Sequence, residues 1–156
     1  MIDRYAHYAR YGELMALAAA SAPARRNDGG YMAALYILSA DKELYSLARS
    51  KISSSGINFS GLLSAARHSE LSDSQIIAAK TAHSLFNGGS RSTAPCELVQ
   101  CDYCTLDIIT DALYIWKGGR IPAADGSGQM CLDRSAERRH RCFETALARH
   151  LSATEA

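Results

Sequence analysis

The sequence has almost no net charge and no long apolar run, and these two absences exclude several classes of protein. Its 17 lysines and arginines face 16 aspartates and glutamates, so no overall field draws the chain to nucleic acid or to a lipid surface. No apolar run approaches the ~20 residues that span a bilayer. Residues 14–24 imitate a signal peptide only weakly, because two acids and three tyrosines precede the short apolar run. We therefore expect a cytoplasmic protein with no membrane partner.

Regular alternation of apolar and polar residues is also missing, so β-strands are not expected. The 156 residues suit one domain, and a chain of this length can bury a core without disulfides or metal. We predict an all-α fold, a single compact bundle of about six or seven helices over residues 1–156.

The best-marked helix is predicted over residues 73–87. Ser72 followed by Gln75 is a capping-box pattern, in which two amide donors at the helix start are satisfied. Apolar residues then recur at helical spacing, and Asn87-Gly88-Gly89 supplies residues that tolerate the left-handed conformation at a helix end. We expect this helix to be the core of the bundle.

Apolar residues at helical spacing also occur in the sequence before and after that helix. A break is expected near Ala40, because Asp41 is a competent cap for a new helix. The Gly/Ala/Pro-rich residues 118–134 predict a linker. The other predicted helices are residues 2–22, 31–53, 59–68, 106–116 and a C-terminal helix over 135–152.

The last two helices have distinct apolar stripes. Between 106 and 116 the stripe comprises Leu106, Ile109, Leu113 and Trp116, flanked by Ile108, Ala112 and Ile115. In the C-terminal helix it comprises Ala136, His140, Phe143, Leu147 and Leu151. An amphipathic terminal helix after a flexible linker can pack on a second copy, so a homo-oligomer is one expectation.

Three blocks of sequence carry a resemblance to a known family. They are ALYILSADKELY from Ala34, LSDS from Leu71 with SLFNG from Ser84, and LD from Leu106 leading into ALYIW from Ala112. Over residues 31–117 the chain resembles a small uncharacterised all-helical domain family of Gram-positive bacteria and their mobile elements. The resemblance implies no known activity. It implies a phage or mobile-element setting, in which small proteins that inhibit host defence complexes, in the manner of anti-CRISPR proteins, are common.

Five cysteines lie late in the chain, an odd number that argues against a secreted disulfide framework. Cys101 and Cys104 form a CxxC, and with Cys96, His140 and Cys142 they could supply a tetrahedral zinc site. A second CxxC or HxxxH is missing, and free cysteines commonly behave as small buried hydrophobes. We favour thiols over zinc and predict neither a metal nor a cofactor.

Two groups of side chains are candidates for binding. Arg138, Arg139 and Arg141 make the C-terminal helix basic and could contact phosphate or an acidic protein. The alternative is a solvated face, since Glu137 and Arg141 form a favourable i,i+4 pair. Tyr5 and Tyr8, with Tyr11 next, could form an interface, or could simply belong to the core.

No catalytic constellation is evident. His83 and Ser84 are adjacent, so on a helix their side chains point about 100° apart and cannot form a dyad. We therefore predict a non-enzymatic protein-binding module, an inhibitor of a host defence complex on the resemblance, with a protein partner whose identity is open. The alternative is a nucleic-acid-binding or zinc-stabilised regulator.

Overall fold

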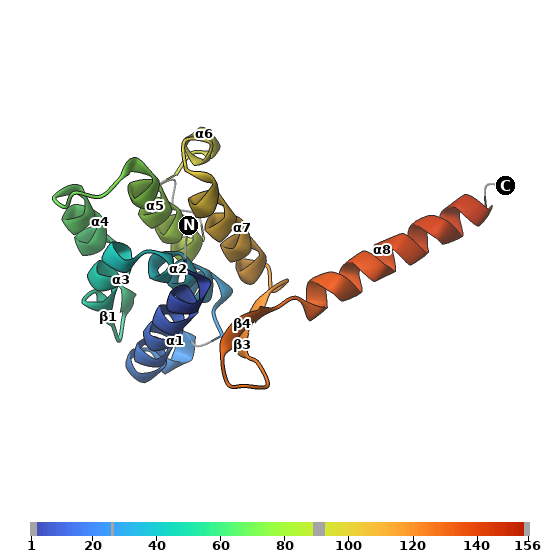
Figure 1. Ribbon diagram of the computed structural model, residues 1–156, viewed down its shortest axis with the longest axis horizontal. Coiled ribbons are helices and arrows are strands. Elements are labelled where there is room, and N and C mark those ends of the chain that lie inside the picture. The colour runs from blue at the N-terminus through green and yellow to red at the C-terminus, as the bar shows by residue number, and fades with distance from the viewer. Residues whose placement is uncertain (1–2, 26, 89–92, 155–156) are drawn as a thin grey trace.

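The computed structural model describes residues 3–25, 27–88 and 93–154, and in these ranges the chain is mostly helical (Figure 1). The all-α prediction is confirmed, and the helices α1 to α7 form the predicted bundle. The elements are α1 (Arg4–Ser21), the 3-10 turn η1 (Pro23–Arg25), α2 (Gly29–Ala40), α3 (Lys42–Arg49), β1 (Ile52–Ser53), β2 (Gly56–Ile57), α4 (Phe59–Arg67), α5 (Asp73–Asn87), α6 (Pro95–Leu98), α7 (Tyr103–Trp116), β3 (Ile121–Ala124), β4 (Met130–Asp133) and α8 (Ser135–Thr154).

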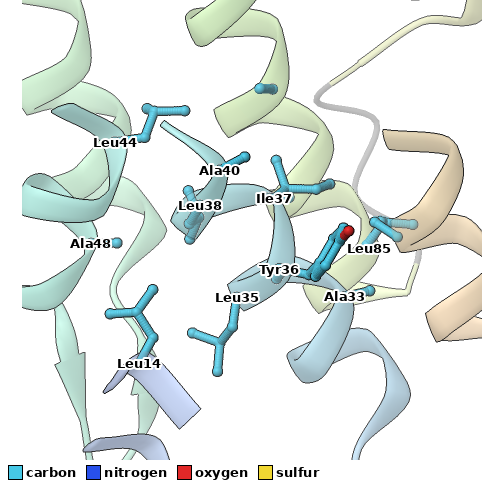
Figure 2. Packing of buried hydrophobic residues seen from close by; sticks show 14 of the residues in the cluster. Leu14, Ala33, Leu35, Tyr36, Ile37, Leu38, Ala40, Leu44, Ala48 and Leu85 are labelled. Atoms are coloured by element: carbon cyan, nitrogen blue, oxygen red, sulfur yellow. The ribbon is translucent and has the colours of Figure 1, made fainter. Parts of the chain in front are cut away.

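Helix α2, rather than α5, is the centre of the bundle. Ten of its twelve residues are buried, and it packs against α1, α5 and α7. Figure 2 shows Leu35, Ile37 and Leu38 of α2 among side chains of the surrounding helices, Leu14 and Leu85 included. A helix that is apolar all round is stable only when other elements cover every side. The prediction that residues 73–87 form the core helix is therefore wrong, although α5 covers one side of α2.

The ends of α5 are as predicted. The Ser72 amide donates to Gln75 Oε1 at 2.7 Å, and the Gln75 amide donates to Ser72 Oγ at 3.3 Å, which completes the capping box. Gly88 ends the helix with a φ of 60°, the left-handed conformation that favours glycine, while Gly89 lies outside the described residues. Local sequence determines both ends of this helix.

The predicted break near Ala40 is also confirmed. Helix α2 ends at Ala40, and Asp41 Oδ1 accepts hydrogen bonds from the amides of Glu43 and Leu44 at 2.9 and 3.0 Å. This cap starts α3 at an angle to α2.

A buried histidine lies where α1 crosses α2. His7 has no exposed surface, and its Nε2–H donates to the Tyr36 carbonyl oxygen at 2.9 Å. A carbonyl only accepts, so Nδ1 is the bare nitrogen, and among the described residues it has no hydrogen-bond partner. Burial, with the Arg4 and Arg10 charges nearby, lowers the pKa of His7 to about 4. The imidazole is therefore neutral at pH 7.

The expectation of no strands is wrong at two places. β1 pairs with β2, and β3 pairs with β4 with Pro122 opposite Leu132. The predicted linker over residues 118–134 is thus largely a hairpin, closed by Asp125 Oδ1 accepting from the amides of Ser127 and Gln129 at 2.8 and 2.9 Å. Strands of two to four residues are too short to show alternation. In a two-stranded ribbon every strand is an edge, which tolerates proline.

Candidate protein-interaction surface

The C-terminal helix α8 projects away from the bundle, as Figure 1 shows in red. Every residue from 138 to 153 is exposed, and only the first turns of the helix lie against the other parts of the chain that the structure describes. The helix prediction over residues 135–152 is confirmed. Most of the stability of a protein helix comes from packing of its amphipathic face against another element, and over most of its 20 residues α8 has no such packing.

An apolar stripe runs along the projecting part of α8. Phe143, Leu147 and Leu151 are 66%, 47% and 55% exposed. Because they are four residues apart, they lie on one side of the helix, in line with Ala136 and His140 nearer its base. The predicted stripe therefore exists, but none of its large side chains is buried within the chain.

The arginines of α8 mostly lie on the opposite side. At 100° per residue, Arg138 and Arg149 point away from Leu147, and Arg139 lies beside the stripe. Arg138, Arg139 and Arg141 are all exposed. Arg141 Nη2 donates to Glu137 Oε1 at 2.8 Å, which is the predicted i,i+4 pair. The structure thus gives α8 one apolar and one basic face.

A buried carboxylate fixes the base of α8 to the bundle. Glu137 is only 8% exposed, and its oxygens accept from Arg134 Nε and Nη2 at 3.0 Å and from Arg120 Nε at 3.0 Å. These hydrogen bonds, the Arg134 bonds first and the Arg120 bond second, lower the pKa of Glu137 to about 2. Glu137 is therefore ionised throughout the neutral range, and its charge is held by three guanidinium groups.

Arg120 connects this carboxylate to the bundle. Its side chain is 10% exposed, it also pairs with Asp111 of α7, and its guanidinium lies 4.3 Å from the centre of the Tyr114 ring. Asp111 in turn accepts from Arg4 of α1 at 3.1 Å and from the Tyr36 hydroxyl of α2 at 3.2 Å. We call Glu137, Arg120, Asp111 and Arg4 the Arg120 junction. It connects α8 to α7, α1 and α2.

Sequence reasoning missed Arg120, because it stands in a segment interpreted as a linker. One signal was available. Arg120 is the only base in the Gly/Ala/Pro-rich residues 118–129, immediately after a helix ends. Small neighbouring residues leave room for a long arginine side chain to contact other elements of the fold.

A groove lies in the angle between the end of α7 and the base of α8. Its volume is about 570 Å³, and Tyr114 and Lys117 form one wall while Ala136, His140 and Glu144 form the other. Lys117 is shared with a smaller hollow bounded by Leu113 and Trp116. The groove therefore continues from the base of the apolar stripe on α8 onto the outer surface of α7.

The outer surface of α7 differs from the prediction. Leu113 and Trp116 are 43% and 50% exposed, whereas Ile108, Ala112 and Ile115, predicted as flanks, are buried with Ile109. When a helix carries large apolar residues on two sides, its sequence does not indicate which side will face the core. The packing of α7 on α2 decides it, and leaves two large apolar side chains outside.

The predicted tyrosine interface does not form as a unit. Tyr5 is 73% exposed, Tyr8 is intermediate, and Tyr11 is fully buried against Tyr36. Residues three apart on a helix turn by −60° at each step, so three such residues spread over about 120°. The core interpretation is right for Tyr11, whereas Tyr5 is on the surface and Tyr8 is partly exposed.

The five cysteines do not gather. Cys96, Cys104 and Cys142 are exposed, and Cys101 and Cys131 are partly covered. Within the described ranges, no three histidine, cysteine or acidic side chains are placed to share a metal ion. Burial raises the pKa of the Cys101 thiol, so it lacks the thiolate character of a reactive cysteine. Cys96, Cys101 and Cys104 lie around α6 and α7, whereas His140 and Cys142 lie on α8, which points away from them (Figure 1).

No family model, curated protein or solved structure matches this chain. The resemblance over residues 31–117 therefore stays a prediction. Among the residues that the structure describes, no helix combines the length and the apolar character needed to cross a membrane.

Proposed function

We propose that this chain is a non-enzymatic protein-binding module, and that its binding surface is α8 together with the outer end of α7. The observation that carries the proposal is the exposed stripe of Phe143, Leu147 and Leu151 on a helix that leaves the bundle. Soluble monomers rarely expose contiguous large apolar side chains, and where they do the patch commonly marks a protein-binding site.

The magnitude of the apolar surface supports this function. Three side chains that are 47–66% exposed offer roughly 100 Å² each, about 300 Å² in all, when a partner covers them. At about 25 cal/mol per Å² this burial is worth about 7 kcal/mol before the costs of association. The stripe alone therefore offsets part of the entropy lost on binding, and the adjoining groove supplies further area.

The Arg120 junction supports the same function in a different way. Charged hydrogen bonds at Glu137 and Asp111 fix the direction in which α8 leaves the bundle. A helix that is already oriented loses less freedom on binding than a segment that must first be ordered. The junction therefore holds α8 in an orientation in which a partner can bind it.

The biological setting is proposed from the resemblance alone. On that basis the chain is an inhibitor from a phage or mobile element, and its target is a component of a host defence complex. Inhibition by binding needs no catalytic group, which agrees with a protein-binding module.

The test uses a photo-reactive amino acid, benzoylphenylalanine, placed at Leu147 in one variant and at Thr145 in another. Both positions are exposed, and Thr145 lies on the opposite side of α8. We expect irradiation of the full chain in bacterial cells to give protein adducts from position 147 and not from position 145. The absence of adducts at position 147 would overturn the proposal.

A second function, nucleic-acid binding, is favoured by one observation. Arg138, Arg139 and Arg149 are all exposed on the projecting helix. These arginine side chains would bind the phosphates of a nucleic acid, with an affinity that falls steeply as the salt concentration rises. A gel shift that persists at about 150 mM salt and weakens in the variant R138A/R149A would support it.

A further inference from the structure

We propose that the apolar stripe of α8 is covered by α8 of a second copy of the same chain, in an antiparallel pair that relates the two copies by a two-fold axis. This inference rests on the proposed function and names the partner of that surface. It concerns Phe143, Leu147 and Leu151, which none of the described elements covers.

The first argument is self-complementarity. An isologous interface requires one patch that matches itself when turned by 180°. With the axis passing near residue 145, Phe143 of one helix lies opposite Leu147 of the other, and this contact is made twice.

The second argument comes from the groove at the base of α8. In the same pairing, Leu151 of the second copy reaches the first turns of α8, next to Ala136 and His140. Those two residues form one wall of the groove of about 570 Å³, and Tyr114 of α7 forms the other. Each helix end therefore fills the groove of the opposite copy.

The third argument is the area. The stripe contributes about 300 Å² per copy, and the exposed walls of the groove add less than half of that. Two copies would then bury roughly 800–900 Å² in total, which is the size of weak, transient interfaces. We therefore expect a dimer that forms only towards the upper end of the concentration range tested.

The charges are compatible with the pairing. Arg138 and Arg149 point away from the stripe, so the two basic faces lie on the outside, roughly 20 Å apart and beyond the Debye length of about 8 Å. The carbonyl end of each α8 carries partial negative charge and comes to rest near Lys117 and Arg141, which line the groove. The two Glu144 side chains approach the axis as like charges, but they are exposed to solvent, which screens their repulsion.

The experiment measures the mass of the full-length chain by size-exclusion chromatography with light scattering, over about 1 to 200 µM. A reducing agent is present, because Cys96, Cys104 and Cys142 are exposed. We expect the mass to rise from 16.9 kDa towards twice that value. Leu147→Glu should weaken the dimer by about 100-fold, since it places a charge against Phe143. Thr145→Glu, on the opposite side of the same helix, should leave the dimer intact.

Both variants change side chains that are exposed in the single chain, so both should keep the helical circular dichroism and the Tm of the monomer. A wild-type chain that stays monomeric at every concentration, or a Leu147→Glu variant that dimerises as well as wild type, would overturn the dimer. Irradiation of the variant with benzoylphenylalanine at position 147 then separates the two proposals. An adduct with a second copy supports the dimer. An adduct with another protein in a monomeric chain overturns the dimer and leaves the proposed function standing, and no adduct at all overturns both.

Discussion

Replacing Arg120 with methionine should both destabilise the protein and release α8 from its fixed direction. Methionine keeps most of the buried volume but removes the charged hydrogen bonds to Glu137 and Asp111. Complete loss of a partner from a buried ion pair costs about 3–5 kcal/mol. Here each carboxylate keeps another cation, Glu137 through Arg134 and Asp111 through Arg4, so we expect a smaller loss of about 2–3 kcal/mol.

The assay is urea unfolding, followed by circular dichroism, together with NMR titration of the Glu137 carboxylate. A loss of 2–3 kcal/mol corresponds to a fall in Tm of roughly 5–10 °C for a chain of this length. The pKa of Glu137 is about 2 because Arg134 and then Arg120 donate to the ionised form. Without Arg120 the pKa should rise, while the Arg134 bonds still keep it below its ordinary value.

The matched control is Arg138→Met, which removes an exposed arginine from α8 near the same junction. Its stability and the Glu137 pKa should both stay close to wild type. If the Arg120 and Arg138 variants unfold at the same urea concentration and the Glu137 pKa does not move, the junction does not anchor α8. The pH dependence of stability should also report the Arg120 junction. The depressed Glu137 pKa contributes stability above its ordinary range, and that stability is lost as the pH falls from about 4.5 to about 2.

Three further predictions concern the bundle. Burial lowers the pKa of His7 from 6.5 to about 4, so between these pH values the unfolded chain binds a proton that the folded chain does not. Acidification across this range should therefore reduce the free energy of unfolding of wild type by about 3 kcal/mol more than that of His7→Gln, measured by urea unfolding. Parallel pH profiles of the two proteins would refute this. Gly30→Ala places a Cβ 2.6 Å from the Leu85 carbonyl oxygen and should cost about 2 kcal/mol or more, whereas Gly126→Ala, with open space around it, should leave Tm unchanged. Ser72→Ala removes the α5 cap and should cost about 1 kcal/mol by the same measurement, so an unaltered Tm would contradict the role of the capping box.

Several features could be predicted from the sequence, because they depend on residues within one or two turns of each other. The capping box of Ser72 and Gln75 starts α5, and Asp41 separates α2 from α3. The stripe of Phe143, Leu147 and Leu151 follows from spacing alone. In each case the geometry of a single helix decides the outcome.

Other features depend on which elements meet. The stripe that contains Leu113 is as apolar as its flank of Ile108, Ala112 and Ile115. Only packing against α2 shows that the flank is buried and Leu113 is left outside. The short strands on either side of Asp125 have no alternation of their own, and pairing reveals them. Arg120 meets Asp111 and Glu137 only after the hairpin has turned the chain.

The candidate surface combines both kinds of information. The sequence by itself determined a mostly helical chain, both ends of α5, the break after α2 and an amphipathic last helix, because hydrogen bonding and side-chain spacing act locally along the chain. Only the tertiary structure decided that this last helix stands clear of the bundle. Helices α1, α5 and α7 already surround α2, and the Arg120 junction directs α8 away from them. The apolar stripe therefore faces outward, where a second protein surface can cover it.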